Sequence, residues 1–283
     1  MINTTANLVI SKSNEVFLKI NTEPHIEYEL RDHFKFEVPN AKFMPQYRGR
    51  NWNGEIHLFD MRSKQIYVGL LDKIVNFCNQ YGYTYTFEDN KFYGTPYEEN
   101  DFISYEGVKD YMNSICSHSP RKYQIEGVYG ALKHNRKLLI SPTASGKSLM
   151  IYSLVRYYVD QGQKILLVVP TTSLVEQMYK DFQDYGWNAD SYCHRIYSGK
   201  EKNNDAPVTI TTWQSVYKLE RSFFEDYNVV IGDEAHLFKS KSLIQIMTKL
   251  HHAKYRFGFT GTLDGTQTHK WVLEGLFGPS YKV

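Results

Sequence analysis

Cysteine is scarce in this chain. Only three of its 283 residues are cysteines, Cys78, Cys116 and Cys193, and they lie far apart. An odd, scattered set fits neither a disulfide framework nor a zinc cluster, so the sequence indicates a reducing compartment. Long apolar runs are also missing. None approaches the roughly 20 residues that span a bilayer, and residues 1–13 lack the pattern of a secretory signal. We therefore expect no membrane association and a cytoplasmic location.

The composition is that of a globular protein, with 42% hydrophobic and 23% charged residues. The length suggests one large or two ordinary domains. A net charge of +2 hides an asymmetry. Residues 1–115 carry 12 Lys+Arg against 16 Asp+Glu, whereas residues 116–283 carry 21 against 15. The second part is therefore expected to be the better partner for a polyanion.

Residues 1–90 predict a small α+β domain, which we interpret as a nucleic-acid-binding domain. Strand patterns occur at 8–10, 16–20, 55–59 and 83–87, and helical patterns at 27–36 and 70–81. Residues 91–120 are polar, with one helix expected at 105–115, and are interpreted as a linker. No internal repeat or low-complexity tract occurs.

From residue 121 onward, short apolar strands alternate with helices. The strands are expected at 138–140, 165–169, 208–211, 229–231 and 255–259, with helices at 149–158 and 173–185. This alternation predicts an α/β fold with a doubly wound, mostly parallel sheet.

A phosphate-binding loop is predicted between the strand at 138–140 and its helix. The sequence there reads Ser141-Pro142-Thr143-Ala144-Ser145-Gly146-Lys147-Ser148. A strand, a loop and a helix in this order direct backbone N–H groups at phosphate oxygens. Gly146 allows close approach, Lys147 reaches the β- and γ-phosphates, and Ser148 ligates Mg²⁺. The strict pattern starts with Gly where this chain has Ser141, so a helix start with an ordinary lysine is the alternative.

Two acidic residues follow a later strand of the same predicted sheet. Asp233 and Glu234 come directly after the apolar run 229–232, at the strand end where open α/β sheets bind ligands. An ordinary acidic loop is the alternative. Together with the phosphate loop, these residues indicate a nucleoside triphosphate site, in which Asp233 holds the metal through water and Glu234 orients or deprotonates the attacking water.

Six ordered segments of residues 121–277 resemble the motifs of superfamily 2 helicases of the DEAH type. They are Arg121-Lys122-Tyr123-Gln124, Pro142 to Ser148, Val169 to Gln177, Thr211 to Gln214, Asp233 to His236 and Thr260-Gly261-Thr262. In that superfamily the first Gly of the phosphate loop is commonly replaced, which accounts for Ser141. The resemblance implies a RecA-like P-loop NTPase lobe over residues 121–283, with ATP and Mg²⁺ as cofactors.

The resemblance also implies residue roles. Gln124 would contact the adenine edge, and the ATP-binding set would be Arg121, Gln124, Thr143, Ala144, Ser145, Gly146, Lys147 and Ser148. The catalytic set would be Lys147, Asp233, Glu234 and His236, with Ser148 and Asp233 on Mg²⁺. His236, together with Thr260, Gly261 and Thr262, would couple the nucleotide state to movement.

Four threonines are implied to contact the nucleic-acid backbone: Thr171, Thr172, Thr211 and Thr212. The alternative for the first pair is that it caps the helix that follows. His236 could likewise be a solvated loop residue.

Within the superfamily the likeness is greatest to phage recombination helicases, and it extends into the first domain over residues 47–54. It implies an ATP-dependent helicase or translocase that remodels forks, Holliday junctions and R-loops. Branched DNA or a DNA–RNA hybrid would be the partner, and the host cytoplasm the location.

Superfamily 2 ATPases combine two RecA-like lobes, and the second donates arginine fingers to the ATP site. This sequence ends at Val283, soon after the third motif. An arginine finger contributes about 10³–10⁵ in rate. We therefore expect an amino-terminal fragment, monomeric and nearly inactive in ATP hydrolysis and unwinding.

Basic and aromatic residues gather in the first domain around Arg48, Arg50 and Trp52. Basic side chains supply phosphate affinity, and exposed aromatics stack on unpaired bases. The sequence therefore indicates a DNA-docking loop. A solvated edge strand with packed aromatics is the alternative.

Three other functions compete with a helicase. A duplex-DNA translocase without strand separation uses the same motifs. A nucleic-acid-binding module with a vestigial ATP site is disfavoured by the intact Lys147, Asp233 and Glu234. A small-molecule P-loop kinase leaves Gln124 and His236 without a role.

Overall fold

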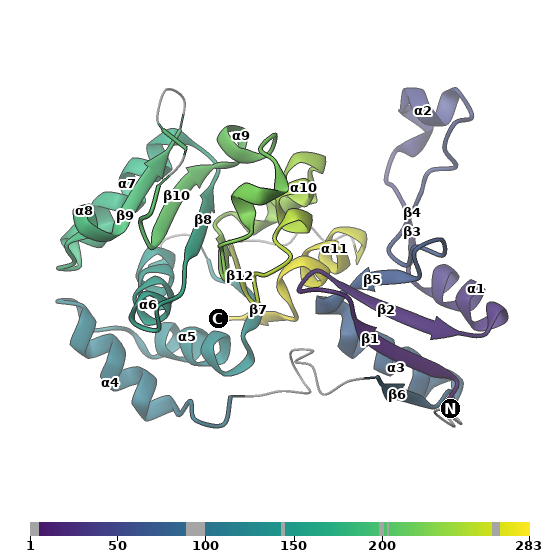
Figure 1. The fold of residues 1–283 in the computed structure, drawn as a ribbon, viewed down its shortest axis with the longest axis horizontal. Coiled ribbons are helices and arrows are strands. Elements are labelled where there is room, and N and C mark those ends of the chain that lie inside the picture. Colours follow the sequence, from purple (N-terminus) through teal and green to yellow (C-terminus); the bar gives the residue numbers. More distant parts are fainter. Residues whose placement is uncertain (1–5, 89–99, 143–144, 198–200, 203, 262–266) are drawn as a thin grey trace.

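The computed structural model describes residues 6–88, 100–142, 145–197, 201–202, 204–261 and 267–283. Figure 1 shows two α/β units side by side, with an arm that rises from the first unit. The fold class inferred from the sequence is confirmed, because a small α+β unit precedes a parallel, doubly wound one.

The first unit is built on a four-stranded mixed sheet in the order β5-β2-β1-β6. Strands β1 (Leu8–Lys12) and β2 (Phe17–Thr22) form the expected antiparallel hairpin. Strand β5 (Gln65–Tyr67) pairs antiparallel with β2, and β6 (Tyr85–Phe87) pairs parallel with β1. The short 3₁₀ turn η2 (Val68–Leu70) leads from β5 into a helix.

Two helices complete the first unit, α1 (Pro24–His33) and α3 (Leu71–Tyr81). Helix α1 begins and ends three residues before its predicted bounds. Pro24 occupies the first turn, where the missing N–H of proline costs nothing, and after Phe34 the chain turns into a strand.

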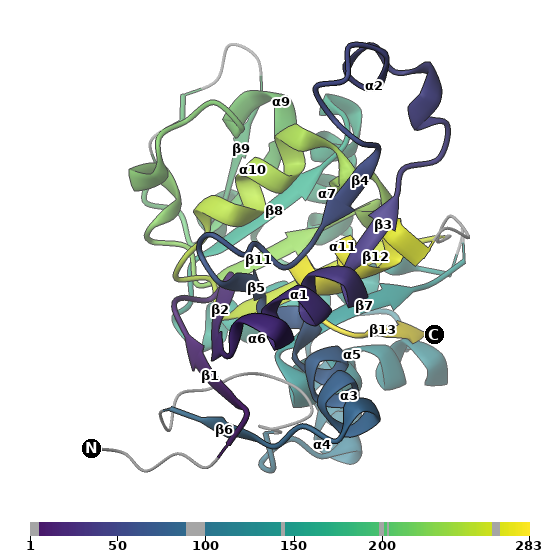
Figure 2. The ribbon, with the colours of Figure 1, turned by 90° about the vertical axis from the view of Figure 1, so that its right-hand side faces the viewer.

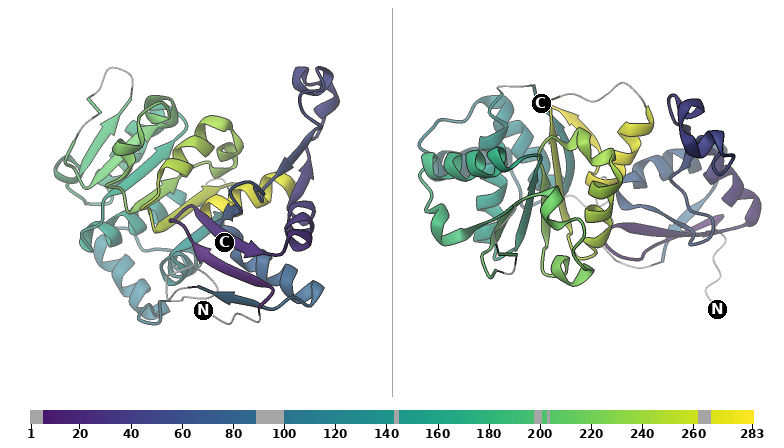
Figure 3. Two further views of the ribbon diagram at one scale, coloured as in Figure 1. Left: turned by 45° about the vertical axis from the view of Figure 1, so that its right-hand side comes forward. Right: turned by 90° about the horizontal axis from the view of Figure 1, so that it is seen from above.

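An arm formed by residues 38–54 projects from the first unit, as Figures 1 and 3 show. Its base is the antiparallel pair β3 (Lys35–Glu37) and β4 (Glu55–His57), and its tip holds η1 (Ala41–Phe43) and α2 (Pro45–Arg48). Residues 42–51 are all exposed. The tip is therefore a surface element with almost no packing of its own.

The second unit, called the lobe, has a seven-stranded sheet in the order β13-β7-β12-β11-β8-β10-β9, parallel throughout. Its strands are β7 (Arg136–Ile140), β8 (Ile165–Val169), β9 (Cys193–Ile196), β10 (Val208–Thr212), β11 (Val229–Gly232), β12 (Tyr255–Thr260) and β13 (Ser280–Lys282). The five predicted strands are confirmed. The edge strands β9 and β13 were missed because they are short, partly exposed and carry polar residues, which erases the apolar signal.

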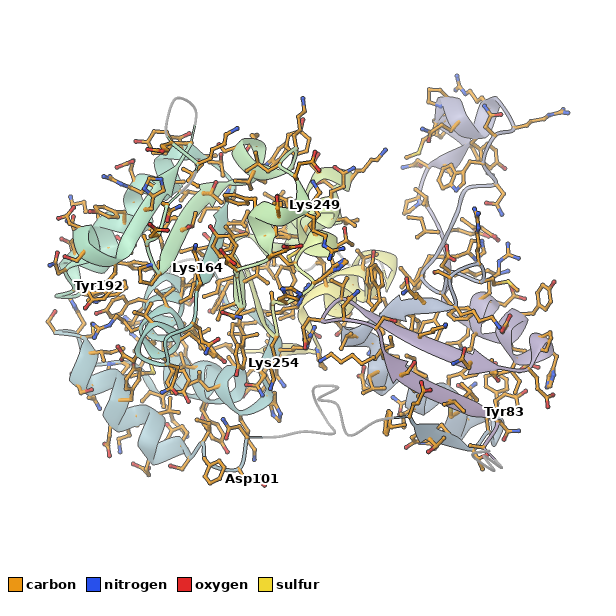
Figure 4. The ribbon with its side chains drawn as sticks, viewed as in Figure 1. Tyr83, Asp101, Lys164, Tyr192, Lys249 and Lys254 are labelled. Atoms are coloured by element: carbon orange, nitrogen blue, oxygen red, sulfur yellow. The ribbon has the colours of Figure 1, made fainter. Side chains whose placement is uncertain are left out.

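Helices cover both faces of this sheet. They are α4 (Tyr105–Ile115), α5 (Lys122–His134), α6 (Lys147–Asp160), α7 (Thr172–Asp184), α8 (Ala189–Tyr192), α9 (Trp213–Val216), η3 (Arg221–Phe224), η4 (Ala235–Lys239), α10 (Lys241–Lys249) and α11 (Gln267–Phe277). Alternate strand residues point to opposite faces. Leu138 thus packs with α10 and α11, whereas Leu139 packs with α5 and α6. In Figure 4, Lys249 of α10 is labelled at one of these layers, where its ammonium donates to the Tyr217 and Leu219 carbonyls.

Helix α4 has the bounds expected for the helix of residues 91–120, and it packs on the lobe. Val108 and Met112 are buried in the cluster that contains α5 and α6. The Tyr152 hydroxyl of α6 donates to the Ile115 carbonyl over 2.8 Å. This helix is therefore part of the layer that covers the sheet.

The contacts that hold the first unit on the lobe include one at α11 and one at the β1–β2 hairpin. Helix α11 lies against η2 so closely that a methyl group on Gly69 would overlap the Glu274 carbonyl. At the tip of the β1–β2 hairpin, the Arg136 guanidinium donates to the Glu15 carboxylate (2.6 Å) and carbonyl (2.8 Å). Arg136 is 2% exposed and begins β7, so the first unit is tied directly to the strand that leads into the phosphate loop.

Within the described ranges, no helix is both long and apolar enough to cross a membrane.

Candidate nucleotide and nucleic-acid sites

Strand β7 ends where the phosphate loop was predicted. The Ser141 N–H donates to the Thr260 carbonyl at the end of β12 (2.8 Å), and its buried hydroxyl lies 2.5 Å from the Ser145 hydroxyl. Gly146 precedes α6 with φ of 74°, a left-handed conformation that favours glycine. Ser141, which replaces the usual Gly, therefore ties the start of the loop to its end. Thr143 and Ala144 lie outside the described residues.

Gln124 is buried beneath this loop. Its amide donates to the carbonyls of Ser145 (2.9 Å) and Gly146 (3.4 Å), and its oxygen accepts the backbone N–H of Arg121 (2.8 Å). The Tyr123 hydroxyl donates to the same Ser145 carbonyl over 2.8 Å. Both polar ends of Gln124 are thus engaged within the protein. Contact with adenine would require one of these bonds to be exchanged, while the Arg121 side chain is exposed.

Lys147 and Glu234 meet across the carboxyl edge of the sheet. Lys147 begins α6 after β7, and Glu234 follows β11, with β12 between these strands. The Lys147 ammonium lies 2.9 Å from the Glu234 carboxylate. Glu234 has φ of 49°, rare for a residue with a side chain and typical of functional sites. The structure therefore brings the two predicted half-sites together.

Asp233 lies beside this ion pair and is 8% exposed. One of its carboxylate oxygens accepts the Glu234 N–H over 2.9 Å. Burial raises the pKa of the Asp233 carboxyl, and the nearby Lys147 charge only partly offsets that rise. A buried carboxylate of this kind is stabilised by an added cation.

His236 connects the acidic loop to the next strand. Its Nδ1 lies 3.1 Å from the Thr260 hydroxyl and 3.3 Å from the Glu234 carboxylate. Thr260 is buried at the end of β12, and Gly261 follows it. The predicted coupling residues His236, Thr260 and Gly261 therefore adjoin the Lys147–Glu234 pair, whereas Thr262 lies outside the described residues.

Ser148, the predicted Mg²⁺ ligand, has a different partner in this structure. Its hydroxyl lies 2.7 Å from the hydroxyl of Tyr185, the residue that ends α7. Nothing in the sequence singled out Tyr185, because its role depends on how α6 and α7 cross. Ligation of a metal by Ser148 would replace or share this bond.

The donor set can be compared with the needs of Mg²⁺. In the described part of the chain, no three His, Cys, Asp or Glu side chains form a ready metal site. Mg²⁺ is usually held by one or two carboxylates together with substrate phosphates. The residues fit a metal that arrives with a nucleotide, held by Asp233 and Ser148. When bound, it would neutralise charge on the phosphates.

The four threonines differ in access. Thr171 and Thr172 are exposed, and the Thr171 hydroxyl caps α7 by accepting the Leu174 N–H over 3.3 Å. Thr211 and Thr212 are buried, at 0% and 5% exposure. In this conformation Thr171 and Thr172 are at the surface, whereas Thr211 and Thr212 are not. Thr171 therefore caps α7, as the alternative interpretation held, and is still accessible to a ligand.

The arm holds the basic residues predicted for nucleic acid. Arg48 and Arg50 are exposed and, with Tyr47 and Trp52, line a hollow on the arm. Trp52 is only partly exposed, because its indole N–H donates to the Glu55 carbonyl over 2.7 Å. Trp52 therefore has its indole N–H engaged within the arm while its ring still lines the hollow.

The most exposed aromatic residue of the arm is Phe43, at 69%. Sequence reasoning missed it because its neighbours predict no particular orientation. The arm rises on the same side of the molecule as α9, which follows β10, as Figures 1 and 2 both show.

These features define a class of protein. A parallel sheet with a phosphate loop after β7, an Asp-Glu pair after β11 and a His–Thr link to β12 is the first RecA-like lobe of a superfamily 2 helicase. A family model described as "Type III restriction enzyme, res subunit" matches residues 117–265, and one described as "DNA helicase UvsW, N-terminal" matches residues 11–88. The chain belongs to the UvsW family of superfamily 2 helicases.

Individual relatives agree with this assignment. The ATP-dependent DNA helicase uvsW of Enterobacteria phage T4 is 33% identical over 276 residues, which are 94% of this chain and 54% of the relative. A crystal structure of the UvsW helicase from bacteriophage T4 is similar with a TM-score of 0.87 and 32% identity, covering 98% of this chain and all of that one. The DNA 3'-5' translocase XPB2 of Sulfurisphaera tokodaii is 30% identical over 159 residues, 56% of this chain and 34% of the relative.

The chain spans about half the length of the curated T4 relative.

Proposed function

We propose that this chain is the amino-terminal part of an ATP-dependent DNA helicase or translocase that remodels branched DNA, including forks, Holliday junctions and R-loops. The observation that carries the nucleotide half is the Lys147–Glu234 ion pair beside the buried Asp233. These are the groups that phosphoryl transfer needs for charge stabilisation and for orienting water.

In this proposal Lys147 binds the β- and γ-phosphates, and Asp233 and Ser148 hold the Mg²⁺ that accompanies them. Glu234 then leaves Lys147 and orients or deprotonates the attacking water. The movement of Glu234 is transmitted from His236 to Thr260 through the 3.1 Å contact between the His236 Nδ1 and the Thr260 hydroxyl. Gln124 holds the loop in place, and its exchange of a loop bond for adenine accounts for a preference for ATP.

The nucleic-acid half rests on two exposed surfaces. One is the exposed edge at Thr171 and Thr172, and the other is the arm with Arg48 and Arg50. DNA held by both would lie across the molecule with its phosphates near basic side chains. A branched substrate, or a DNA–RNA hybrid, offers more than one duplex arm to such separated surfaces. A duplex translocase without strand separation is the second candidate, favoured by the likeness of the lobe to a DNA 3'-5' translocase.

We also propose that the 283-residue chain by itself is monomeric, binds Mg-nucleotide weakly and turns it over slowly. No arginine of the described residues contacts Lys147, Asp233 or Glu234. In these residues no arginine finger would therefore stabilise the charge on the transferring phosphoryl group. Turnover by this chain at the rate of a complete helicase would contradict this part.

The test of the proposal is binding of a fluorescent ATP analogue with Mg²⁺, together with binding to matched fork, junction, R-loop and duplex substrates. The Lys147→Ala variant is expected to lower nucleotide affinity at least tenfold. Lys122→Ala is the matched control, because Lys122 is 83% exposed and pairs only with Glu126 on its own helix. Equal nucleotide affinity in both variants, or no preference for branched over duplex DNA, would overturn the corresponding half of the proposal.

A further inference from the structure

Tyr185, which contacts the Ser148 hydroxyl, is itself fixed by packing. The centroid of its ring lies 5.1 Å from that of Tyr152 of α6 and 5.9 Å from that of His118, which it meets edge-on. Its backbone N–H donates to the Asp181 carbonyl over 2.9 Å at the end of α7. The 2.7 Å distance between the Tyr185 and Ser148 hydroxyls therefore joins two packed helices at a defined point.

A carboxyl group of the same helix lies near this pair of hydroxyls. Asp181 precedes Tyr185 by about one turn of α7. Burial raises the pKa of the Asp181 carboxyl, and its interaction with the Ser148 hydroxyl offsets part of that rise. Burial also raises the pKa of the Tyr185 hydroxyl, and the charge of Asp181 adds to the rise. The Ser148 hydroxyl thus meets two oxygen-bearing side chains of a single helix.

The hydrogen-bonding capacity of Ser148 shows what these neighbours leave over. A serine hydroxyl has one proton and two lone pairs. If Tyr185 donates to Ser148, the Ser148 proton is available to the Asp181 carboxylate and one lone pair is left. If Ser148 donates to Tyr185, both lone pairs are left. In either direction the proton has a partner on α7, and at least one lone pair is available to a cation.

The Ser148 hydroxyl belongs to the nucleotide site. Ser148 directly follows Lys147, whose ammonium lies 2.9 Å from the Glu234 carboxylate, so the first turn of α6 adjoins the acidic loop. A hydroxyl binds a metal through a lone pair, with its proton directed elsewhere. Neighbours that hold a ligand in its binding orientation matter for metal affinity, and their loss typically lowers it about 10–100-fold.

We propose that Tyr185, assisted by Asp181, is the positioning residue that holds the Ser148 hydroxyl with a lone pair free for Mg²⁺. The proposal rests on the proposed function, in which Ser148 is a metal ligand, and deepens it. The bond to Tyr185 is kept when the metal binds, so the two share the Ser148 oxygen. Neither Tyr185 nor Asp181 lies in one of the six motif segments, so the resemblance assigns them no role.

The test titrates Mg²⁺ into the whole chain with a fluorescent ATP analogue and repeats the nucleotide titration in EDTA. Tyr185→Phe keeps the packed ring and removes only the hydroxyl. It should raise the Mg²⁺ concentration at half-maximal binding about tenfold, the lower end of the range because Asp181 remains. Nucleotide affinity in EDTA should stay at the wild-type value.

Tyr111→Phe is the matched control. The Tyr111 hydroxyl donates to the Asp160 carboxylate over 2.9 Å, at the opposite end of α6 from Ser148. This variant therefore also removes one tyrosine hydroxyl bonded to another helix, and it should leave both the Mg²⁺ midpoint and the affinity in EDTA unchanged.

A double-mutant cycle separates positioning from general damage. Ser148→Ala removes the ligand, so adding Tyr185→Phe to it should not shift the Mg²⁺ midpoint further. Three results would overturn the positioning proposal alone: an unchanged midpoint in Tyr185→Phe, a lower midpoint, which would mean that the hydroxyl competes with the metal, or the full shift in the Ser148→Ala background. Wild-type nucleotide binding that is absent or independent of Mg²⁺ would overturn the nucleotide half of the proposed function and the positioning proposal with it.

Discussion

The nucleotide site and the arm solve the same problem, binding phosphate groups, in opposite ways. Around the nucleotide site, Lys147 is 15% exposed and paired with Glu234, and the Gln124 amide holds the loop by donating to the Ser145 and Gly146 carbonyls. On the arm, Arg48 and Arg50 are exposed. The first site is held by hydrogen bonds and an ion pair before its ligand arrives, whereas the arm presents its cations in the open. Preorganised sites gain specificity, and exposed cations supply affinity that falls with salt.

The largest expected effect comes from breaking the link between the first unit, which carries the arm, and the lobe, which carries the nucleotide site. Glu15→Ala leaves Arg136 buried without its carboxylate partner, and such a loss costs about 3–5 kcal/mol. Burial lowers the pKa of Arg136 while Glu15 raises it, so the pair depends on both members. Urea unfolding should show the loss. The exposed Glu106, paired with Lys109, is the control, and Glu106→Ala should change stability by less than about 1 kcal/mol.

The next effect sharpens the account of Gln124. Gln124→Ala removes the amide that donates to the Ser145 and Gly146 carbonyls of the phosphate loop, and the oxygen that accepts the Arg121 N–H, at a cost of about 1–3 kcal/mol for the carbonyls and N–H group left behind. If holding the loop is its main task, affinities for ATP and GTP should fall together. A fall for ATP alone, measured with fluorescent analogues of both, would show instead that adenine contact dominates.

A smaller effect is expected on the arm. Replacing Arg48 and Arg50 together by Ala should weaken DNA binding and reduce the slope of log affinity against log salt by about 1.8, since each phosphate contact contributes about 0.9. The arm should stay folded, because Trp52 remains bonded to Glu55. Titrations at several salt concentrations give the slope, and an unchanged slope would mean that these cations do not touch phosphate.

The smallest effect concerns Asp233. Because burial raises its pKa in the folded state, the folded chain binds this proton more tightly than the unfolded chain, and stability falls as pH rises through the folded pKa. Asp233→Asn should therefore raise the melting temperature at neutral pH by a few degrees and leave it nearly unchanged in acid. The same variant should lose Mg-dependent nucleotide binding. A lower melting temperature at neutral pH would contradict the cause given for the shift.

The nucleotide site was predicted from the sequence better than the arm was. Lys147, Asp233 and Glu234 were placed together correctly, because strand ends of a parallel sheet meet at one edge and the spacing of motifs fixes their order. The same reasoning predicted Ser141 next to the loop but not its bond to Ser145.

The contacts between separate helices and strands could not be predicted from the sequence. The partner of Ser148 is Tyr185, 37 residues away, and the pairing depends on the crossing of two helices. The burial of Thr211 follows from its place inside a central strand. On the arm, the Trp52 indole N–H is bonded to the Glu55 carbonyl while Phe43 is 69% exposed, and no pattern in a short irregular segment encodes either.

The central claim is that the chain bears two separate phosphate-binding surfaces, one for nucleotide and one for DNA. The most direct measurement compares Lys147→Ala with the Arg48→Ala/Arg50→Ala pair, each titrated with a fluorescent ATP analogue and with labelled junction DNA. The account predicts a crossed result, in which the first variant loses nucleotide and keeps DNA, and the second loses DNA and keeps nucleotide. Loss of both ligands in either variant, or wild-type nucleotide affinity in Lys147→Ala, would contradict it.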